Sequence, residues 1–274
     1  MGRFANSKAL AGASWNVLKA DKELAVLPVL SFVATIPVVA LFGGGIYVSM
    51  DRTTTAATSE LSPTPLTYVI GAVGYLLLTF VVFFFTAALV SGALERFRGG
   101  NPSVGSALGG AGKRIGPIFA WAMLAGTVGL LLQALEERLG VLGQIAVRLV
   151  GMAWQIVTWL AIPVIVDQGT GPFASLRESA SLFRRTWGEN LISQAGLGII
   201  ALLVMLPGLL IGGAVAVALP FVGIPLIVVW AVVVSIVFTA LNGILRTAIY
   251  LFATGQEVPG FSHATLQGTF RLKS

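Results

Sequence analysis

The sequence contains no cysteine, and it is poor in histidine and in charge. The absence of cysteine excludes disulfide bonds, thiolate metal sites and thiol nucleophiles. The single histidine, His263, cannot form a multi-histidine metal site. Only 10% of the 274 residues are charged, whereas a soluble domain carries roughly 25%. The sequence therefore predicts a large surface that faces lipid instead of water.

Apolar residues make up 56% of the chain, and they gather in six long runs. Each run reaches the roughly 20 residues that a helix needs to cross the hydrocarbon layer. Each must be helical, because backbone groups in lipid have to be paired internally. The predicted spans are about 24–50, 66–94, 115–135, 142–166, 194–219 and 221–253. We predict an all-α fold, a polytopic membrane helix bundle that forms one domain over residues 1–274.

Lysine and arginine are distributed unevenly between the two ends of the predicted spans. Fourteen of the 17 basic residues lie at one end, and only Arg52, Arg138 and Arg148 lie at the other. Cytoplasmic loops carry the excess of basic residues in membrane proteins. We therefore predict a cell-membrane protein with both termini in the cytoplasm. Residues 51–65 are rich in Thr, Ser and Pro and predict a flexible external loop.

Glycine followed by proline marks the end of every second predicted span, at 99–102, 169–172 and 255–259. Glycine suits the left-handed cap of a helix, and proline suits the first turn of the next helix. We predict three repeats of an interfacial amphipathic helix followed by a transmembrane hairpin. The units cover about residues 1–101, 102–171 and 172–258, with a tail helix in 259–274.

The segment 173–187 has the clearest amphipathic pattern. Helical spacing places one stripe of apolar residues on a single face: Phe173, Leu176, Ala180, Phe183 and Trp187. Arg177 and Arg184 flank this stripe, an arrangement typical of helices at the headgroup boundary. Residues 104–115 repeat part of the pattern. A looser version near the N-terminus places on one face Phe4, Ala11, Trp15 and Leu18.

Residues 14–28 (SWNVLKADKELAVLP) resemble the opening of an uncharacterised family of prokaryotic multi-pass membrane proteins. That family begins with a Ser-Trp-x-hydrophobic-Leu-Lys-x-Asp-Lys-Glu-Leu signature that leads into the first span. Residues 254–261 (TGQEVPGF) resemble the family's ending. The resemblance extends over the whole chain by span layout. It implies an integral membrane protein and supplies no activity.

Few polar side chains fall within the predicted spans. Gln155 and Asn242 are candidates for an intramembrane polar site, or alternatively for hydrogen bonds between packed helices. Arg246 lies near the cytoplasmic boundary, where it meets Asp167 or Glu95 or extends to the interface. No Asp, Glu, Lys or His lies near the middle of a span. We therefore expect no catalytic residues, no metal site, no cofactor and no enzymatic activity.

Basic residues at the cytoplasmic boundary are the candidates for binding lipid headgroups or a partner protein. They are Lys19, Lys22, Arg177, Arg184, Arg185 and Arg246. Acidic residues among them predict ion pairs that hold the interfacial helices to the span ends. We expect anionic membrane lipids as partners, together with a protein partner or a second copy of the chain. We expect no nucleic acid, because the basic residues follow the span ends.

Two functions are compatible with these patterns. The first is a lipid-interacting scaffold or accessory subunit, which the three amphipathic helices on one leaflet favour. The second is a transporter or channel for a small apolar or lipidic molecule, which the repeats, the prolines within spans (Pro28, Pro37, Pro163 and Pro207) and Gln155 favour. The second function requires a membrane-embedded cavity that reaches Gln155.

Replacing Arg177, Arg184 and Arg185 with Gln tests the first function. We expect weaker binding of anionic lipid, because each exposed basic residue contributes roughly 1 kcal/mol of attraction to an anionic surface. Native mass spectrometry of the protein in mild detergent measures the anionic lipid that is retained. Unchanged retention would show that this helix does not bind headgroups.

Overall fold

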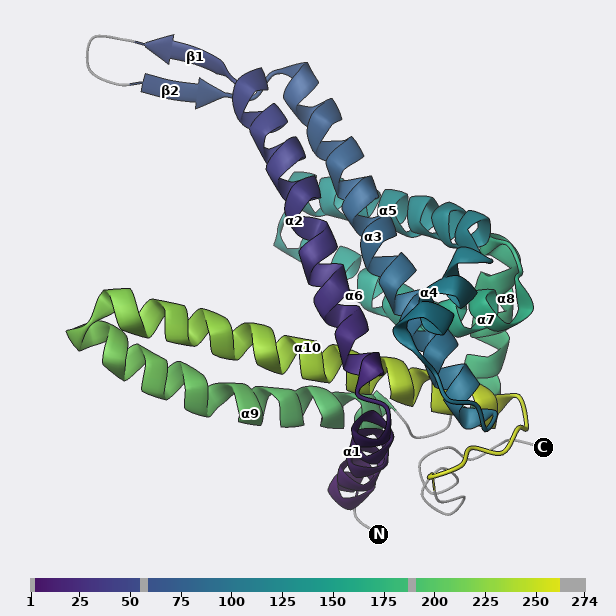
Figure 1. Cartoon of the computed structure of the whole chain (residues 1–274). Helices are drawn as coiled ribbons and strands as arrows, with labels where there is room; N and C mark the ends of the chain where they lie inside the picture. The colour runs from purple at the N-terminus through teal and green to yellow at the C-terminus, as the bar shows by residue number, and fades with distance from the viewer. Residues whose placement is uncertain (1–2, 55–58, 187–190, 262–274) are drawn as a thin grey trace.

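The computed structural model describes residues 3–54, 59–186 and 191–261, and helices dominate these ranges (Figure 1). The elements in chain order are α1 (Arg3–Ala20), α2 (Glu23–Ser49), β1 (Asp51–Thr54), β2 (Ser59–Ser62), α3 (Pro65–Phe97), α4 (Val104–Gly112), α5 (Ile115–Arg138), α6 (Val141–Thr158), α7 (Ala161–Gln168), α8 (Pro172–Thr186), α9 (Leu191–Ala218) and α10 (Pro220–Ala253). This composition confirms the predicted all-α class, to which the strands add one small hairpin.

Six helical segments in the described ranges are long and apolar enough to cross a membrane. They are α2, α3, α5, α6 continued by α7, α9 and α10. Each coincides with one of the six predicted spans. Much of their surface consists of large apolar side chains, and Phe221 at the start of α10 is 95% exposed. Such a surface is stable only against lipid, so the chain is a multi-pass membrane protein.

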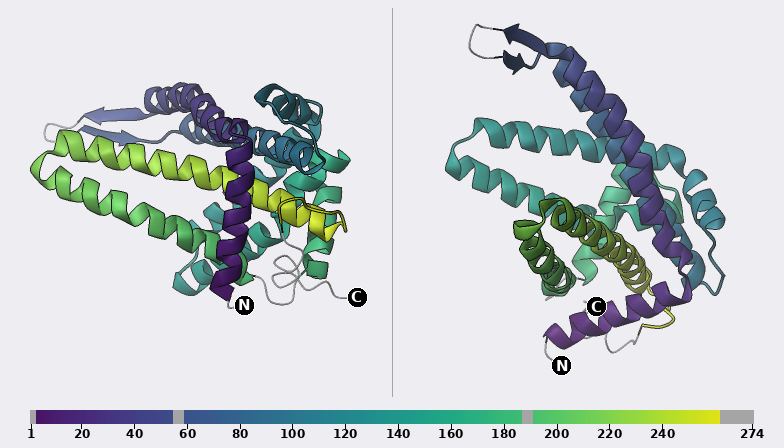
Figure 2. Two further views of the ribbon diagram at one scale, coloured as in Figure 1. Left: turned by 60° about the horizontal axis from the view of Figure 1, so that its bottom comes forward. Right: turned by 60° about the vertical axis from the view of Figure 1, so that its left-hand side comes forward.

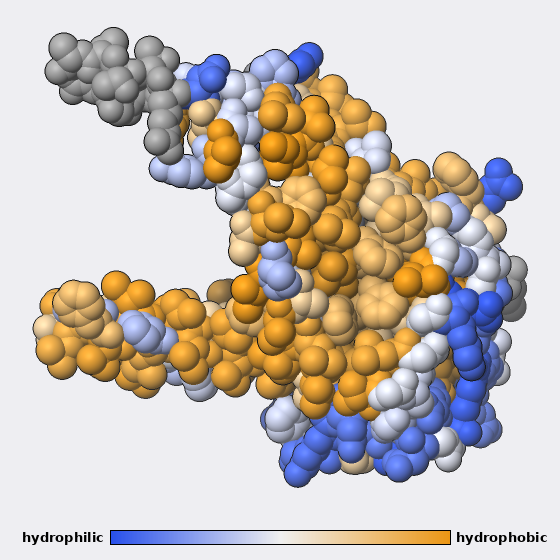
Figure 3. All heavy atoms as spheres, turned by 45° about the horizontal axis from the view of Figure 1, so that its top comes forward, coloured by the Kyte–Doolittle hydropathy of each residue, from blue (hydrophilic) through white to orange (hydrophobic). Residues whose placement is uncertain are grey.

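The spans form three hairpins that diverge from a common end of the molecule (Figures 1 and 2). The hairpins are α2 with α3, α5 with α6, and α9 with α10. The common end holds α1, α4, α7 and α8, and we call it the basic end. The side chains that define it are Lys19, Lys22, Arg96, Arg98, Lys113, Arg114, Arg177 and Arg184. Figure 3 shows hydrophilic side chains gathered there and apolar side chains along the hairpins.

A short helix precedes each hairpin, as the repeat prediction requires: α1, α4 and α8. The predicted glycine caps are also confirmed, because Gly99, Gly169 and Gly255 have φ values of 83°, 70° and 77°. Positive φ is strained for residues with a Cβ atom, which explains glycine at these helix ends. The division into units at residues 101 and 171 stays a prediction. Most of the predicted tail helix lies outside the described residues.

The external loop predicted as flexible contains an antiparallel β-hairpin. Strands β1 and β2 pair with Asp51 opposite Ser62. Threonine is β-branched and favours extended backbone, which accounts for strand formation in this Thr-rich stretch. Thr64 then caps α3, and its Oγ1 donates a hydrogen bond to the Ser49 carbonyl at 2.9 Å. The end of α2 is thereby held against the start of α3.

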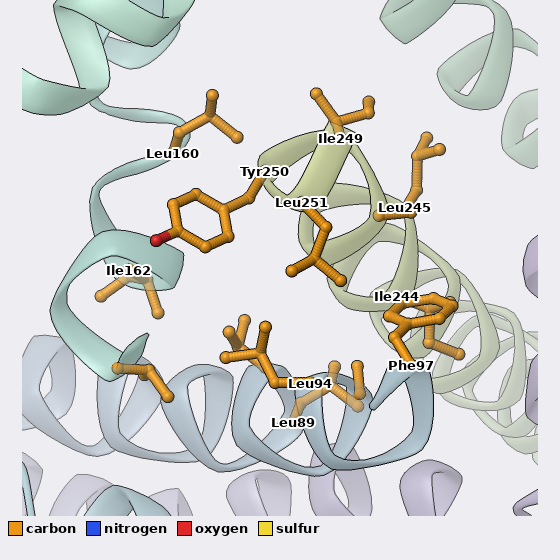
Figure 4. Packing of buried hydrophobic residues seen from close by; sticks show 14 of the residues in the cluster. Leu89, Leu94, Phe97, Leu160, Ile162, Ile244, Leu245, Ile249, Tyr250 and Leu251 are labelled. Carbon is orange, nitrogen blue, oxygen red and sulfur yellow. The ribbon is translucent and has the colours of Figure 1, made fainter. Parts of the chain in front are cut away.

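The buried core lies at the basic end, where α3, α7 and α10 meet (Figure 4). Leu89 and Leu94 of α3 face Ile244 and Leu251 of α10. A Cβ atom at Gly243 would clash with Leu89, so glycine allows α10 to approach α3 closely. Close backbone approach through small residues is the usual means of packing helices in membranes. The three hairpins are therefore joined at this end.

The fourth span is broken at Trp159 and Leu160, between α6 and α7. Pro163 lacks an N–H group, and its ring crowds the carbonyl four residues earlier, at Trp159. Ser179 of α8 pairs backbone groups at the break: its Oγ donates to the Val157 carbonyl and accepts from the Leu160 N–H at 3.2 Å. The other prolines within spans, Pro28, Pro37 and Pro207, lie inside helices that continue through them, α2 and α9.

We expect Ser179→Ala to lower the free energy of unfolding by about 1–3 kcal/mol, because the Leu160 N–H would lose its acceptor in a buried position. Thermal unfolding in detergent measures the change. Ser181→Ala is the matched control, since Ser181 lies on the same helix and is not fully buried. Equal stability of the two variants would show that Ser179 does not support the break.

Candidate functional site

A cavity of about 440 Å³ lies among α3, α5 and α6, with its inner end at α7 and α10. Three small residues on facing helices, Ala125, Gly129 and Gly151, leave space between the larger side chains. The remaining lining residues are Tyr75, Thr79, Phe83, Trp121, Leu132, Trp154, Gln155, Thr158, Trp159, Ile162 and Arg246. The cavity thus reaches Gln155, as the transporter hypothesis requires.

Aromatic rings form much of the cavity wall. The rings of Trp121 and Trp154 are stacked, with centroids 6.4 Å apart and planes inclined by 8°. Phe83 meets Trp121 edge-on at 6.4 Å between centroids. These contacts fix the positions of the rings across α3, α5 and α6. The wall is therefore largely aromatic, with isolated polar groups between the rings.

Arg246 closes the inner end of the cavity. Its guanidinium carbon lies 5.4 Å from the centroid of the Trp159 ring, which is the geometry of a cation–π contact. Its buried Nε has no hydrogen-bond partner among the described residues. The indole Nε1 of Trp121, in the same cavity, is buried and also lacks a partner in the described part of the chain. Two buried donors without acceptors therefore line one cavity.

The expected pairing of Arg246 with Asp167 or Glu95 is wrong. Asp167 accepts from Arg98 at 2.7 Å and from the Tyr250 hydroxyl at 2.8 Å, and Glu95 accepts from Ser106. The cause is depth, since Arg246 lies seven residues before the end of α10, about 10 Å along the helix. The carboxylates at the span ends meet Arg98 and Ser106 instead.

The two polar residues predicted for an intramembrane site, Gln155 and Asn242, lie in different environments. Gln155 lies on the cavity wall together with Arg246. Asn242 is exposed, and its Nδ2 donates to the carbonyl of Phe238 on its own helix at 2.9 Å. Arg148 also lies away from the cavity, where it pairs with Glu136 at 2.7 Å. Gln155 therefore lies at the cavity, and Asn242 is not among the residues that line it.

Residues 66–260 match a described protein family, the Family of unknown function (DUF6159). The chain belongs to this family. The match confirms the resemblance to an uncharacterised family, although residues 14–28, which suggested it, lie before the matched region. No curated protein matches the sequence. The cavity and Arg246 both lie within the DUF6159 region, so the cavity belongs to the part that defines the family.

In this DUF6159 protein, the described basic candidates other than Arg246 lie on the surface of the basic end and do not line the cavity. Arg177 and Arg184 are exposed on α8, and Lys22 is exposed before α2. Lys19 lies over the Trp15 ring at 5.5 Å from its centroid. The side chain of Arg185 lies outside the described residues. The structure therefore separates a surface group of basic residues from one basic residue in a cavity.

The faces of α1 and α8 that pack on the protein differ from the predicted apolar stripes. On α8 the buried residues are Ser175, Ser179 and Leu182, whereas Phe173 is 66% exposed. On α1 the inward residues are Leu10, Ser14, Val17 and Leu18, whereas Trp15 is exposed. Trp187 lies outside the described residues. Parts of the predicted stripes are thus left to face the surroundings.

Ion pairs join the elements at the basic end, as the mixed charges predicted. Arg96 Nε lies 2.9 Å from Oδ2 of Asp21, without the alignment of a hydrogen bond. Burial raises the pKa of the Asp21 carboxyl above its usual value, and the nearby Arg96 acts in the opposite direction. Arg98 pairs with Asp167 at 2.7 Å and joins α3 to α7. No cluster suited to a metal ion occurs in the described ranges.

Proposed function

We propose that the protein binds a small apolar or lipidic molecule within the membrane and serves as its transporter or channel, without catalysing a reaction. The cavity among α3, α5 and α6 carries this proposal. Its volume of about 440 Å³ lies in the range of roughly 300–1,000 Å³ found for small-molecule sites. Aromatic walls with a few polar groups are the usual lining of such sites.

The broken fourth span supports the same proposal. The break at Trp159 and Leu160 lies at the inner end of the cavity, since Trp159 lines it and Ile162 follows in α7. Discontinuous helices form the substrate sites of many transporters, because their half-helix ends direct dipoles and backbone polar groups at the substrate. We propose that α7 and α8 adjust as a unit when a molecule enters or leaves.

Filling the cavity tests this proposal. We expect Ala125→Phe to abolish saturable quenching of tryptophan fluorescence by brominated 1-dodecanol, because the new ring would occupy the space beside Trp121. Three of the six tryptophans line the cavity, so a bound brominated chain quenches them directly. Ala134→Phe is the matched control, since Ala134 lies exposed on the same helix.

Thermal unfolding verifies that both variants fold like the native protein. Saturable quenching that persists unchanged in Ala125→Phe would place the binding site elsewhere and contradict the proposal.

A second candidate function is a lipid-interacting scaffold or accessory subunit. It rests on the exposed Arg177 and Arg184 of α8, which lie on the same helix as the exposed Phe173. Such a surface suits anionic headgroups, and a partner protein or a second copy would bind at the same end. The triple Arg→Gln variant separates this function from cavity binding, because neither Arg177 nor Arg184 lines the cavity.

We further propose that the protein lies in the cell membrane with its N- and C-termini in the cytoplasm. The concentration of Lys and Arg at the basic end supports this orientation, since cytoplasmic segments carry such an excess. The other end, at the tips of the hairpins, would then face the outside.

The lack of native cysteine makes this orientation directly testable. We expect a membrane-impermeant maleimide to label Gly140→Cys in intact cells, and Gly112→Cys only after permeabilisation. Both glycines have open space where the new Cβ would lie, so neither change disturbs packing. The reverse labelling pattern would invert the topology.

A further inference from the structure

We propose that the cavity selects amphiphiles with one anionic head, a carboxylate or a phosphate monoester, and that Arg246 holds this head at the inner end. This inference rests on the proposed function, because it names the class of molecule that the same cavity binds. The apolar chain of the molecule would extend along α5 toward Leu132. Trp121 and Leu132 are 11 residues apart, about 16 Å along the helix.

The charge of Arg246 is the first observation behind this proposal. An arginine within a membrane span is costly and is usually paired or functional. The acidic residues at the adjoining span ends are engaged, Asp167 with Arg98 and Tyr250, and Glu95 with Ser106. The contact that is present, the Trp159 ring, stabilises a cation without neutralising it. The positive charge is therefore left for an anion in the cavity.

The second observation is the pair of buried donors. Nε of Arg246 and Nε1 of Trp121 have no acceptor among the described residues, and both residues line the cavity. Donors buried without acceptors are unfavourable, so such groups commonly receive a ligand oxygen. A carboxylate or phosphate has several acceptor oxygens in a plane or fork that guanidinium matches well. A neutral hydroxyl would satisfy fewer donors and would leave the charge uncompensated.

The apolar remainder of the cavity excludes a bare inorganic anion as the preferred ligand. Phe83, Ala125, Leu132 and Ile162 line the space beyond the donors. An anion without a chain would leave these side chains facing water in the cavity, which the hydrophobic effect disfavours. An amphiphile matches both regions at once, with its head at Arg246 and its chain between the aromatic walls.

Binding of dodecanoate, dodecyl phosphate and 1-dodecanol to the purified protein in detergent at pH 8 tests this proposal. Competition against brominated 1-dodecanol, read by tryptophan fluorescence, gives the three affinities. We expect the two anions to bind about tenfold or more tightly than the alcohol, as charged hydrogen bonds allow. In Arg246→Gln we expect this preference for the anions over the alcohol to disappear.

Two further variants make the test specific. Arg246→Lys keeps the charge but loses the fork of donors, so we expect it to retain part of the preference. Arg148→Gln is the matched control, because Arg148 also lies in a span but pairs with Glu136 and is 66% exposed. We expect this control to behave like the native protein. Trp121→Phe should weaken both anions more than Trp154→Phe does, since of these two cavity residues Trp121 has the indole N–H that is buried without a partner among the described residues.

The outcomes are distinguishable. Equal affinity of the native protein for dodecanoate and 1-dodecanol would overturn the proposed anionic class of ligand. This measurement does not depend on the folding of any variant. A preference that survives in Arg246→Gln overturns the role of Arg246. Displacement of the probe by millimolar inorganic phosphate would identify a free-anion site and overturn the amphiphile. Absence of saturable binding for all three compounds overturns the proposed function itself.

Discussion

The need to pair every backbone polar group inside the membrane governs this structure. Five of the six spans meet it as continuous helices, and the fourth does not. At its break the Val157 carbonyl and the Leu160 N–H are paired by one hydroxyl, that of Ser179. Because the hydroxyl comes from α8, that helix must lie against the break. The position of α8, and with it the inner end of the cavity, follows from this one requirement.

Charged side chains near the membrane must likewise be paired. Asp167 at the end of α7 bonds to Arg98 of α3 and to Tyr250 of α10, so one carboxylate joins three elements near the basic end. Each of its two oxygens then has one partner, and Arg246, one turn before Tyr250, contacts the ring of Trp159. The ion pairs that hold the basic end together thus engage Asp167 with Arg98 and not with Arg246.

The spans and the glycine caps could be predicted because each depends on a local physical requirement. An apolar run long enough to cross lipid has few alternatives, and a left-handed cap favours glycine at Gly99, Gly169 and Gly255. The break at Leu160 was harder to predict, because a continuous apolar run has the same composition whether the helix that it forms is continuous or broken. Pro163 was a signal for it, but Pro28 and Pro207 carried the same signal without a break.

Packing faces could not be predicted by the rules that hold in water. In a soluble protein the apolar face of α8 would point inward. Beside lipid an apolar side chain can remain outside, so Ser175, Ser179 and Leu182 pack on the protein while Phe173 is exposed, although Leu176 of the predicted stripe packs against the core. Gln155 lines the cavity, which is one of the two alternatives that the sequence left open for this side chain. The depth of Arg246 required the structure, since sequence spacing alone did not exclude Asp167.

The cavity also explains why three hairpins are joined at one end. Its walls come from α3 of the first hairpin and from α5 and α6 of the second, and its cation comes from α10 of the third. No single hairpin contains both the aromatic wall and Arg246. Close contact between α3 and α10, which Gly243 permits against Leu89, places the guanidinium beside Trp159 at the break. The site is therefore a property of the assembled fold, and the packing of α10 on α3 at Gly243, about one turn before Arg246, contributes to its electrostatic character.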